Sequence, residues 1–214
     1  MLTEDEIRAV WAGCDADHGI IADAFRLMLV TAQRRGEVLS MRWQDVDCSW
    51  WTIPAELAKN GLAHRVPLSR QALAILEGLR NRPTGPWVFP SPTTARPIEN
   101  PQKAAERLRE RSKVPDLCLH DLRRTAASLM TGMGISRLTV KKILNHAERD
   151  VTAVYDRHSY DPEKRSALEA WSRRLETIVS GHGSKGQVVA PGARRRARLD
   201  SGLSPSQDQH RRMS

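Results

Sequence analysis

The sequence contains few cysteines, and they are scattered. Cys14, Cys48 and Cys118 are the only three, so at least one of them has no partner for a disulfide bond. An odd, widely spaced set is typical of reduced thiols in a cytosolic protein. The sequence also lacks a Cys-x-x-Cys pair, an aspartate-rich run and a phosphate-binding P-loop, so neither a bound metal nor a nucleotide is indicated. We therefore expect no cofactor.

Long apolar runs are missing as well. No stretch reaches the roughly 18 consecutive apolar residues that a membrane-spanning helix needs. The first residues, Met1 to Glu6, are acidic and lack the positively charged and apolar parts of a secretory signal. These features predict a cytoplasmic protein without a membrane partner.

Acidic residues are outnumbered by basic ones. The 34 lysines and arginines exceed the 25 acidic residues, giving a net charge of +9 and a pI of about 10.1. Such a charge favours a polyanionic partner, with nucleic acid first and an anionic membrane surface second.

Large apolar residues become scarce after Gly181. The segment is rich in glycine, serine, proline, arginine and glutamine, and it holds seven basic against two acidic residues, 7 − 2 = +5. So little apolar surface cannot offset the entropy of ordering the chain. We expect one domain over residues 1–178 and a basic, disordered tail over residues 179–214.

The apolar periodicity predicts an α+β fold that is mainly helical. Thr3 followed by Glu6 is a capping box that opens a helix to about Gly13. The apolar run over residues 21–30 predicts a helix that is buried on most of its surface. Further helical segments are expected at 38–41, after Ser69, at 101–111, 119–130, 135–144 and 151–155, and from Asp161-Pro162 onward.

A small antiparallel sheet is expected in the N-terminal half. Residues 50–53 and 66–68 are predicted strands, with Asn60-Gly61 as the hairpin turn between them. Residues 87–89 are a candidate third strand.

The predicted last helix carries one apolar stripe, formed by Leu168, Trp171, Leu175 and Ile178. Two alternatives remain open for this stripe. It packs on the core of its own chain, or it docks into a neighbouring subunit.

A set of potential catalytic residues is arranged in a defined order along the chain. The set comprises Arg34, Lys59, His120, Arg123, His146 and Tyr155. A phenol has a pKa of about 10, so it attacks poorly at pH 7 without a proton acceptor and nearby positive charge. Arginine forks bind phosphate oxygens in a bidentate way. The combination is suited to cutting a phosphodiester bond with a tyrosine.

Each of these residues also has an ordinary structural explanation. His120-x-x-Arg123 can be a capping histidine with a surface arginine, and Arg34 with Glu37 is a common helical ion pair. Lys59 can be a solvated turn residue, and Tyr155 can be half-buried. The consistent order favours function, and Arg34 stands between apolar segments where a solvated charge is not expected.

The motifs resemble those of the tyrosine recombinase (phage integrase) family. Residues 31–38 resemble its first box, with Arg34 as a catalytic residue and Glu37 as its supporting acid. Residues 58–61 and 65–68 resemble its β-hairpin lysine region, which assigns Lys59. Residues 120–125 resemble its second box, which assigns His120 and Arg123.

The resemblance continues toward the C-terminus and covers about residues 1–178. Leu144-Asn145-His146 resembles the family's Leu-Gly-His, which assigns His146 and leaves Tyr155 as the nucleophile. Asn145 replaces the usual glycine, which is tolerable in a left-handed conformation because asparagine adopts it readily.

The resemblance implies DNA cleavage and rejoining through a 3′-phosphotyrosyl intermediate. Arg34 and Arg123 would hold the phosphate, His120 would act as base or orient the phosphate, Lys59 would protonate the leaving oxygen, and His146 would bind phosphate or support an arginine. No metal would be required. The implied partner is double-stranded DNA, bound by a homo-oligomer such as a tetramer in a bacterial or phage setting. The further DNA-binding candidates are Arg35, Arg65 and Arg124.

Family members usually carry an N-terminal core-binding domain, which is not expected in this chain. Two alternatives to a recombinase stay open: a topoisomerase-like nicking and closing enzyme that would use the same residues, and, because that domain is not expected, a non-catalytic or accessory DNA-binding fragment of an integrase.

Overall fold

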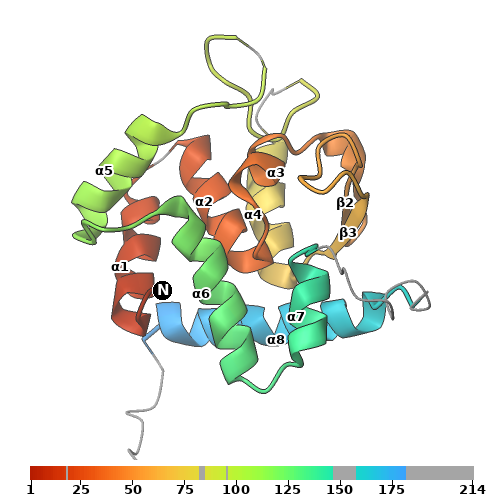
Figure 1. Cartoon of the computed structure of the whole chain (residues 1–214). Coiled ribbons are helices and arrows are strands. Elements are labelled where there is room, and N and C mark those ends of the chain that lie inside the picture. The colour runs from red at the N-terminus through yellow and green to blue at the C-terminus, as the bar shows by residue number, and fades with distance from the viewer. Residues whose placement is uncertain (18, 82–84, 95, 147–157, 182–214) are drawn as a thin grey trace, which may run out of the picture. The chain divides into compact units, whose positions relative to one another are not determined.

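The computed structural model of the chain is shown in Figure 1 and describes residues 1–17, 19–81, 85–94, 96–146 and 158–181. Met1–Gly183 form one compact unit. The predicted helix at 151–155, Tyr155 and nearly all of the predicted tail lie outside the described residues.

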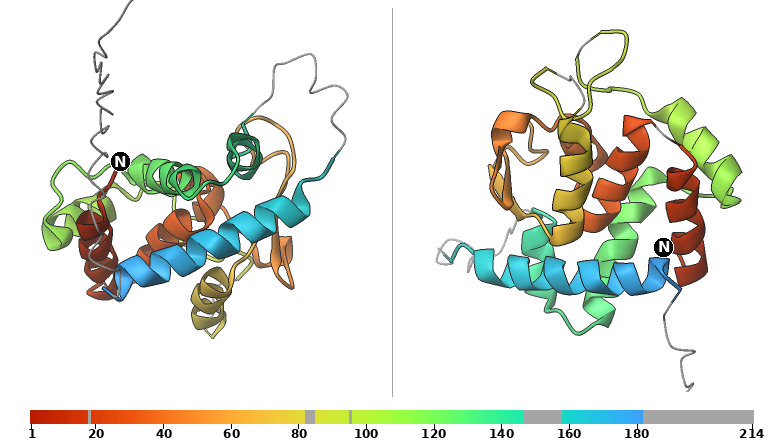
Figure 2. Two further views of the ribbon diagram at one scale, coloured as in Figure 1. Left: turned by 90° about the horizontal axis from the view of Figure 1, so that it is seen from below. Right: turned by 180° about the vertical axis from the view of Figure 1, so that it is seen from behind.

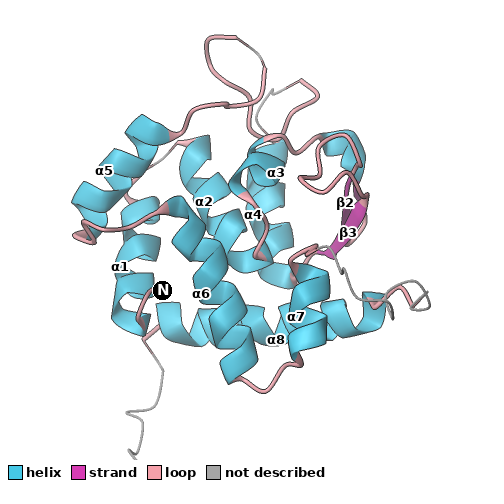
Figure 3. Cartoon of the chain, in the orientation of Figure 1, coloured by secondary structure: helices cyan, strands magenta, loops and turns pink. Residues whose placement is uncertain are grey.

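The described part is mainly helical with one small sheet, as Figure 3 shows, so the predicted α+β class is confirmed. Its helices are α1 (Glu4–Asp15), α2 (Ile20–Thr31), α3 (Arg35–Leu39), the 3₁₀ turn η1 (Trp43–Asp45), α4 (Arg70–Arg80), α5 (Gln102–Ser112), α6 (Leu119–Gly132), α7 (Arg137–Ile143) and α8 (Asp161–Val179). Its strands are β1 (Val46–Asp47), β2 (Trp50–Ile53) and β3 (His64–Pro67). None of the described helices is long and apolar enough to cross a bilayer.

Side-chain caps fix several helix starts where local sequence predicted them. Thr3 and Glu6 form the expected capping box of α1, each side chain accepting a hydrogen bond from the other residue's backbone N–H. The Ser69 hydroxyl accepts from the backbone N–H of Ala72 at the start of α4. These signals lie within a few residues of one another, and the sequence therefore reveals them.

The sheet corrects the predicted third strand. Its order is β1-β2-β3, all antiparallel, with Ile53 opposite His64 and Val46 opposite Trp51. The third strand is thus Val46–Asp47, and the predicted strand at 87–89 is wrong. That segment forms only an isolated bridge from Trp87 to Arg42.

The expected hairpin turn is also corrected. Strands β2 and β3 are joined by residues 54–63, and Asn60-Gly61 lies inside this longer connection. The Pro54 carbonyl accepts from the N–H groups of Leu57 and Ala58, so the chain coils locally after β2 instead of continuing the ladder. Gly61 has a φ of 71°, a left-handed value at which glycine has no steric penalty.

Helix α2 lies at the centre of the core. Nine of its residues are buried, and it packs against α1, α4, α6 and α8. This agrees with the predicted helix that is apolar on most of its surface. Its burial fixes the position of the segment that follows it, which carries Arg34.

Helix α8 crosses this core (Figure 2) and contacts α1 near one end and α7 and β3 near the other. All four residues of its apolar stripe are buried, and the Trp171 indole Nε1–H donates to the Leu29 carbonyl at 2.9 Å. Of the two alternatives for the stripe, the structure shows packing on the core of its own chain.

Candidate active site

Arg34 is held at a sharp change of chain direction. Helix α2 ends at Thr31, Ala32 adopts a left-handed conformation with φ 58°, and Arg34 is the extended N-cap residue of α3. The buried Glu37 carboxylate accepts from Arg34 twice, from the guanidinium Nη1 at 2.9 Å and from the backbone N–H at 3.0 Å. Glu37 therefore fixes both the backbone and the side chain of Arg34, as the resemblance implied for a supporting acid.

Arg123 lies on α6 and is buried. Its Nη1 donates to the Ala32 carbonyl at 2.8 Å, and its Nη2 donates to the Leu144 carbonyl at 2.5 Å. Burial, together with the nearby charge of Arg34, lowers the pKa of Arg123 to about 10, and the Glu37 carboxylate opposes the shift. A guanidinium with such a pKa is still charged at pH 7. Two arginine cations are thus held close together with a single buried acid.

The C-terminal end of α7 collects side chains from distant parts of the chain. The Ile143 carbonyl accepts from Gln33 Nε2 at 3.0 Å and contacts His64 Nε2 at 2.9 Å. The Asn145 carbonyl accepts from Arg34 Nη2 at 3.4 Å. Carbonyls at a helix C-terminus carry partial negative charge, which suits these donors.

His146 directly follows this end of the helix. It is exposed, and its pKa is lowered by partial burial and by the charges of Arg123, Arg34 and Lys141. Its imidazole is therefore neutral at pH 7. Asn145 has a φ of 47°, so it adopts the left-handed conformation that the sequence predicted for an asparagine in place of glycine.

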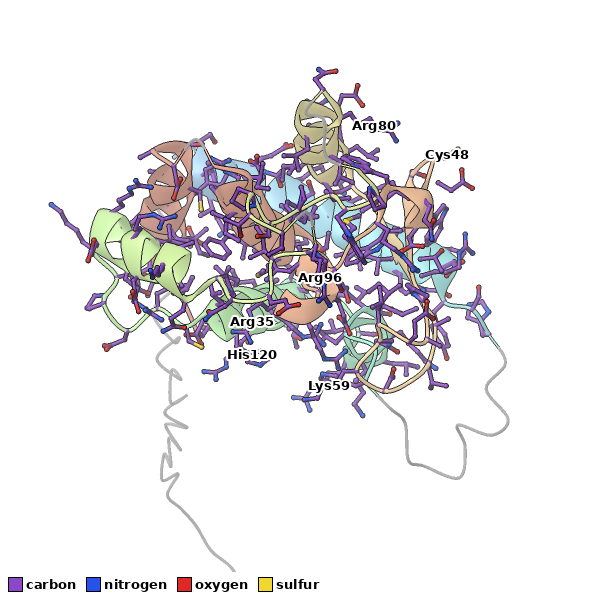
Figure 4. All side chains as sticks on the ribbon, turned by 90° about the horizontal axis from the view of Figure 1, so that it is seen from above. Arg35, Cys48, Lys59, Arg80, Arg96 and His120 are labelled. Carbon is purple, nitrogen blue, oxygen red and sulfur yellow. The ribbon has the colours of Figure 1, made fainter. Side chains whose placement is uncertain are left out.

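One pocket of about 380 Å³ brings most of the predicted catalytic residues together. Arg34, Lys59, His120 and Arg123 all line it, although they come from the start of α3, the β2–β3 connection and α6. Figure 4 shows Arg35, Lys59 and His120 on the same side of the molecule, away from Cys48 and Arg80. Within the described ranges, no group of three or more His, Cys, Asp or Glu residues could hold a metal ion.

His146 lines a second pocket, of about 490 Å³, together with the basic residues Arg65, Lys142 and Lys164. A hydrogen bond links the linings of the two pockets at the end of α7, where Arg34 of the first pocket donates to the Asn145 carbonyl of the second. Tyr155 lies outside the described residues, so its assignment continues to depend on the sequence pattern.

The three predicted DNA-binding arginines differ in their surroundings. Arg35 is exposed and lines the first pocket. Arg124 is exposed, with its Nη1 3.3 Å from the Asp121 carboxylate. Arg65 stacks 4.3 Å from the centroid of the Trp50 ring and donates to Asp161 at 2.5 Å, so it links the sheet to α8.

Sequence reasoning missed several residues of the site. Gln33 is buried in the first pocket and its Oε1 has no hydrogen-bond partner among the described residues. Arg109 and Cys118 line the same pocket, and Asn60 lines the second. Gln33 stands beside Arg34 in the first motif and Asn60 stands beside Lys59 in the hairpin motif, and these positions were the sequence signals for the two residues.

Solved structures of integrases and recombinases share this fold. A lambda integrase fragment, residues 75–356, bound as a dimer to a COC′ core site matches with a TM-score of 0.55 and 23% identity, over 69% of this chain and 57% of that one. The lambda integrase catalytic core matches with a TM-score of 0.54 and 23% identity, over 70% of this chain and 93% of that one.

Sequence comparison extends this likeness to family level. Prophage integrase IntA of Escherichia coli K12 is 30% identical over an alignment of 161 residues, which covers 73% of this chain and 39% of the relative. The shufflon-specific DNA recombinase of Escherichia coli is 30% identical over 157 residues, again 73% of this chain and 39% of the relative. The chain thus spans about two fifths of the length of these relatives. The model of the phage integrase family matches residues 1–161, and the chain belongs to this family.

Proposed function

We propose that the chain catalyses site-specific DNA recombination, breaking and rejoining DNA strands through a 3′-phosphotyrosyl intermediate. The observation that carries the proposal is the pocket in which Arg34, Lys59, His120 and Arg123 converge. Family membership supports it, as do the names of the relatives, which are integrases and a DNA recombinase.

The two arginines would bind the non-bridging oxygens of the scissile phosphate. The bonds from Arg34 to Glu37 and from Arg123 to two carbonyls hold both guanidiniums before DNA binds. Donors fixed in advance stabilise the charge that develops in the transition state without reorganising. The electrostatic part of the mechanism would therefore fall to Arg34 and Arg123, whose hydrogen bonds within the protein are described above.

The proton transfers would divide between His120 and Lys59. The Tyr155 oxygen forms a bond to phosphorus, and its proton passes to His120. The bond from phosphorus to the 5′ oxygen breaks, and Lys59 supplies the proton that turns this oxygen into a hydroxyl group. His146, neutral at pH 7, would donate one hydrogen bond to the phosphate or support an arginine. Because the phosphotyrosyl bond preserves the energy of the broken linkage, rejoining needs no ATP.

The proposal includes the partners and the division of the chain. Double-stranded DNA would lie against the face that carries Arg35, Lys59 and His120, with Arg124 as a further phosphate contact. Residues 1–178 would be the catalytic domain, and residues 179–214 a basic tail that adds affinity for DNA. Recombination between two duplexes would need a tetramer on DNA, acting in the cytoplasm. Arg65, held by Trp50 and Asp161, would have the smallest role in binding.

The test is covalent capture of the 214-residue chain on DNA. Nicked duplexes of randomised sequence allow the cut strand to lose its short 3′ portion, so an attached protein cannot rejoin it. We expect a detergent-stable adduct that mass spectrometry locates on Tyr155. Tyr155→Phe should abolish the adduct and retain DNA binding, whereas Tyr160→Phe should keep both.

Three outcomes would contradict parts of this proposal. An adduct on Tyr160 would overturn the choice of nucleophile. Adducts that relax supercoils but never join two duplexes would indicate a nicking and closing enzyme. DNA binding without any adduct would favour an accessory DNA-binding fragment.

A further inference from the structure

The β2–β3 connection and the end of α7 are joined by a reciprocal pair of asparagines. Asn60 Nδ2 donates to Asn145 Oδ1 at 3.0 Å, and Asn145 Nδ2 donates back to Asn60 Oδ1 at 3.1 Å. The two residues are 85 positions apart in the sequence and both are half-buried. Two reciprocal hydrogen bonds between the side-chain amides fix the relative orientation of the two residues as well as their distance.

Backbone contacts extend the pair on both sides. Asn60 Nδ2 also lies 3.2 Å from the Asn145 carbonyl, and the Leu62 N–H donates to Asn60 Oδ1 at 3.2 Å. The Asn145 carbonyl also accepts from Arg34 Nη2 at 3.4 Å. Asn145 is therefore in contact with both the β2–β3 connection and one of the two arginines.

Each asparagine stands next to a proposed catalytic residue. Lys59 directly precedes Asn60, and His146 directly follows Asn145. Lys59 is exposed and lies on a connection that has few ladder bonds to hold it. A long, exposed lysine loses considerable rotamer and backbone freedom when it is confined to one position, so its connection needs an anchor.

We propose that the Asn60–Asn145 pair is a positioning device that sets Lys59 relative to Arg34 and His146. Neither asparagine touches the reacting atoms in this proposal; the pair acts through Lys59. The inference rests on the proposed function, because it assigns to Lys59 the proton transfer to the leaving 5′ oxygen.

The chemistry of the leaving group separates positioning from general stability. In a DNA substrate with sulfur in place of the bridging 5′ oxygen, the leaving group is a thiolate. Thiols have a pKa near 8.5, so this group departs without a proton donor. A change that misplaces only Lys59 should slow cleavage of the oxygen substrate and spare the sulfur substrate.

Single-turnover cleavage by full-chain variants tests this, on a site recovered from the randomised duplexes. Asn60→Ala removes the amide, and Asn145→Gly removes its partner while keeping a residue that tolerates the left-handed backbone. We expect each to be slower by about tenfold or more on oxygen and within about threefold of wild type on sulfur, a loss within the range of general acid catalysis. Lys59→Ala should behave in the same way, and Arg34→Ala should be slow on both substrates.

The double variant and a matched control complete the design. Asn60→Ala with Asn145→Gly should lose little more than either single variant, because the pair acts as a unit. Asn100→Ala changes an exposed asparagine with a local bond to the Gln102 N–H and should leave both rates unchanged. Equal losses on both substrates, or no loss on oxygen, would overturn the positioning role.

A readout without DNA keeps the coupling testable if the wild-type chain forms no adduct, an outcome that would overturn the proposed function. In ¹⁵N spectra of the free chain, Asn145→Gly should shift the backbone amide signal of Lys59, and Asn60→Ala should shift that of His146. Asn100→Ala should shift neither. Unmoved signals would show that the pair does not couple these segments, whatever the chain does to DNA.

Discussion

Arg34 and Arg123 share a charge but are held in different ways. Arg34 is anchored by one buried carboxylate, and Arg123 is anchored by two backbone carbonyls from segments before α3 and after α7. A planar guanidinium can meet two carbonyls and still present further N–H donors, whereas an ammonium is a single point of charge. The two sites therefore require arginine for geometric reasons.

Lysine at either position should retain the charge and lose the function. We expect Arg34→Lys and Arg123→Lys to slow adduct formation by about 10² or more, as for removal of one preorganised oxyanion donor. Arg80→Lys is the matched control, an exposed arginine away from the pocket that should change the rate only slightly. Thermal melts should accompany the rates, and wild-type rates in both lysine variants would contradict bidentate clamping of the phosphate.

His64 makes a prediction about pH and stability. It is buried on β3 beside the Ile143 carbonyl, and burial with the nearby Lys164, Arg123 and Arg34 lowers its pKa to about 4. In the unfolded chain the imidazole of His64 takes up a proton near pH 6.5, whereas in the folded chain it stays neutral down to about pH 4. The stability that neutral, buried His64 contributes is therefore complete above pH 6.5 and is lost as the pH falls toward 4. Between pH 6.5 and 5 the loss is about 1.5 × 1.36, or roughly 2 kcal/mol.

The comparison with His64→Gln isolates this effect. The glutamine amide can still donate to the Ile143 carbonyl but does not titrate. Denaturant unfolding at pH 7.5 and pH 5 should show wild type losing about 2 kcal/mol more than the variant. Parallel losses in the two proteins would mean that His64 is not buried as a neutral group.

The contacts of the site explain what sequence reasoning could and could not find at this scale. Arg34, Lys59, His120 and Arg123 stand in short motifs, so their assignment needed only neighbouring residues. The contacts from Arg123 to the Leu144 carbonyl, and from Gln33 to Ile143, join residues that no local pattern relates. They exist only because α2, α6 and α7 pack together.

Elements show the same division between local and distant information. Helices α1, α5 and α6 were predicted to within about two residues at each end because periodicity and caps are local. Strand β1 has two residues and pairs with β2, so it is too short to show the alternation of apolar and polar residues that predicts a strand. Residues 87–89 had strand composition but lacked a full partner, because Trp87 bridges only Arg42.

Helix α8 provides a prediction at the scale of one element. Trp171 is fully buried and donates a hydrogen bond to the Leu29 carbonyl, so truncation to alanine removes both a large apolar side chain from the core and this hydrogen bond. Trp171→Ala should lower the free energy of unfolding by about 3–5 kcal/mol. Glu169→Ala, on the exposed side of the same helix, should change it by less than about 0.5 kcal/mol.

Sedimentation of the same proteins distinguishes packing within one chain from docking between chains. If α8 packs on its own core, as in the structure, Trp171→Ala should be less stable at any protein concentration. Docking into a second subunit would show itself in one of two ways. The difference in stability between wild type and Trp171→Ala would disappear when the wild type is diluted, or the variant would sediment as a monomer where the wild type is an oligomer.

At the scale of the whole molecule, positive charge is unevenly divided along the sequence. Residues 184–214 contain seven basic and two acidic residues, so the net charge of +9 falls to +4 when they are removed, 9 − 5 = 4. The compact unit Met1–Gly183 holds every described element of the fold. Affinity for DNA and stability of the fold should therefore respond differently to loss of this segment.

Deletion of residues 184–214 should flatten the dependence of DNA affinity on salt. For every phosphate that the shortened chain no longer neutralises, the slope of log affinity against log salt should fall by about 0.9, because fewer counterions are released. Replacing Arg194, Arg195 and Arg196 with glutamine should produce a smaller change, up to about 2.7 if all three bind phosphates. Both proteins should melt at nearly the wild-type temperature. An unchanged slope would exclude the segment from the DNA interface, and a large fall in melting temperature would show that it contributes to the core.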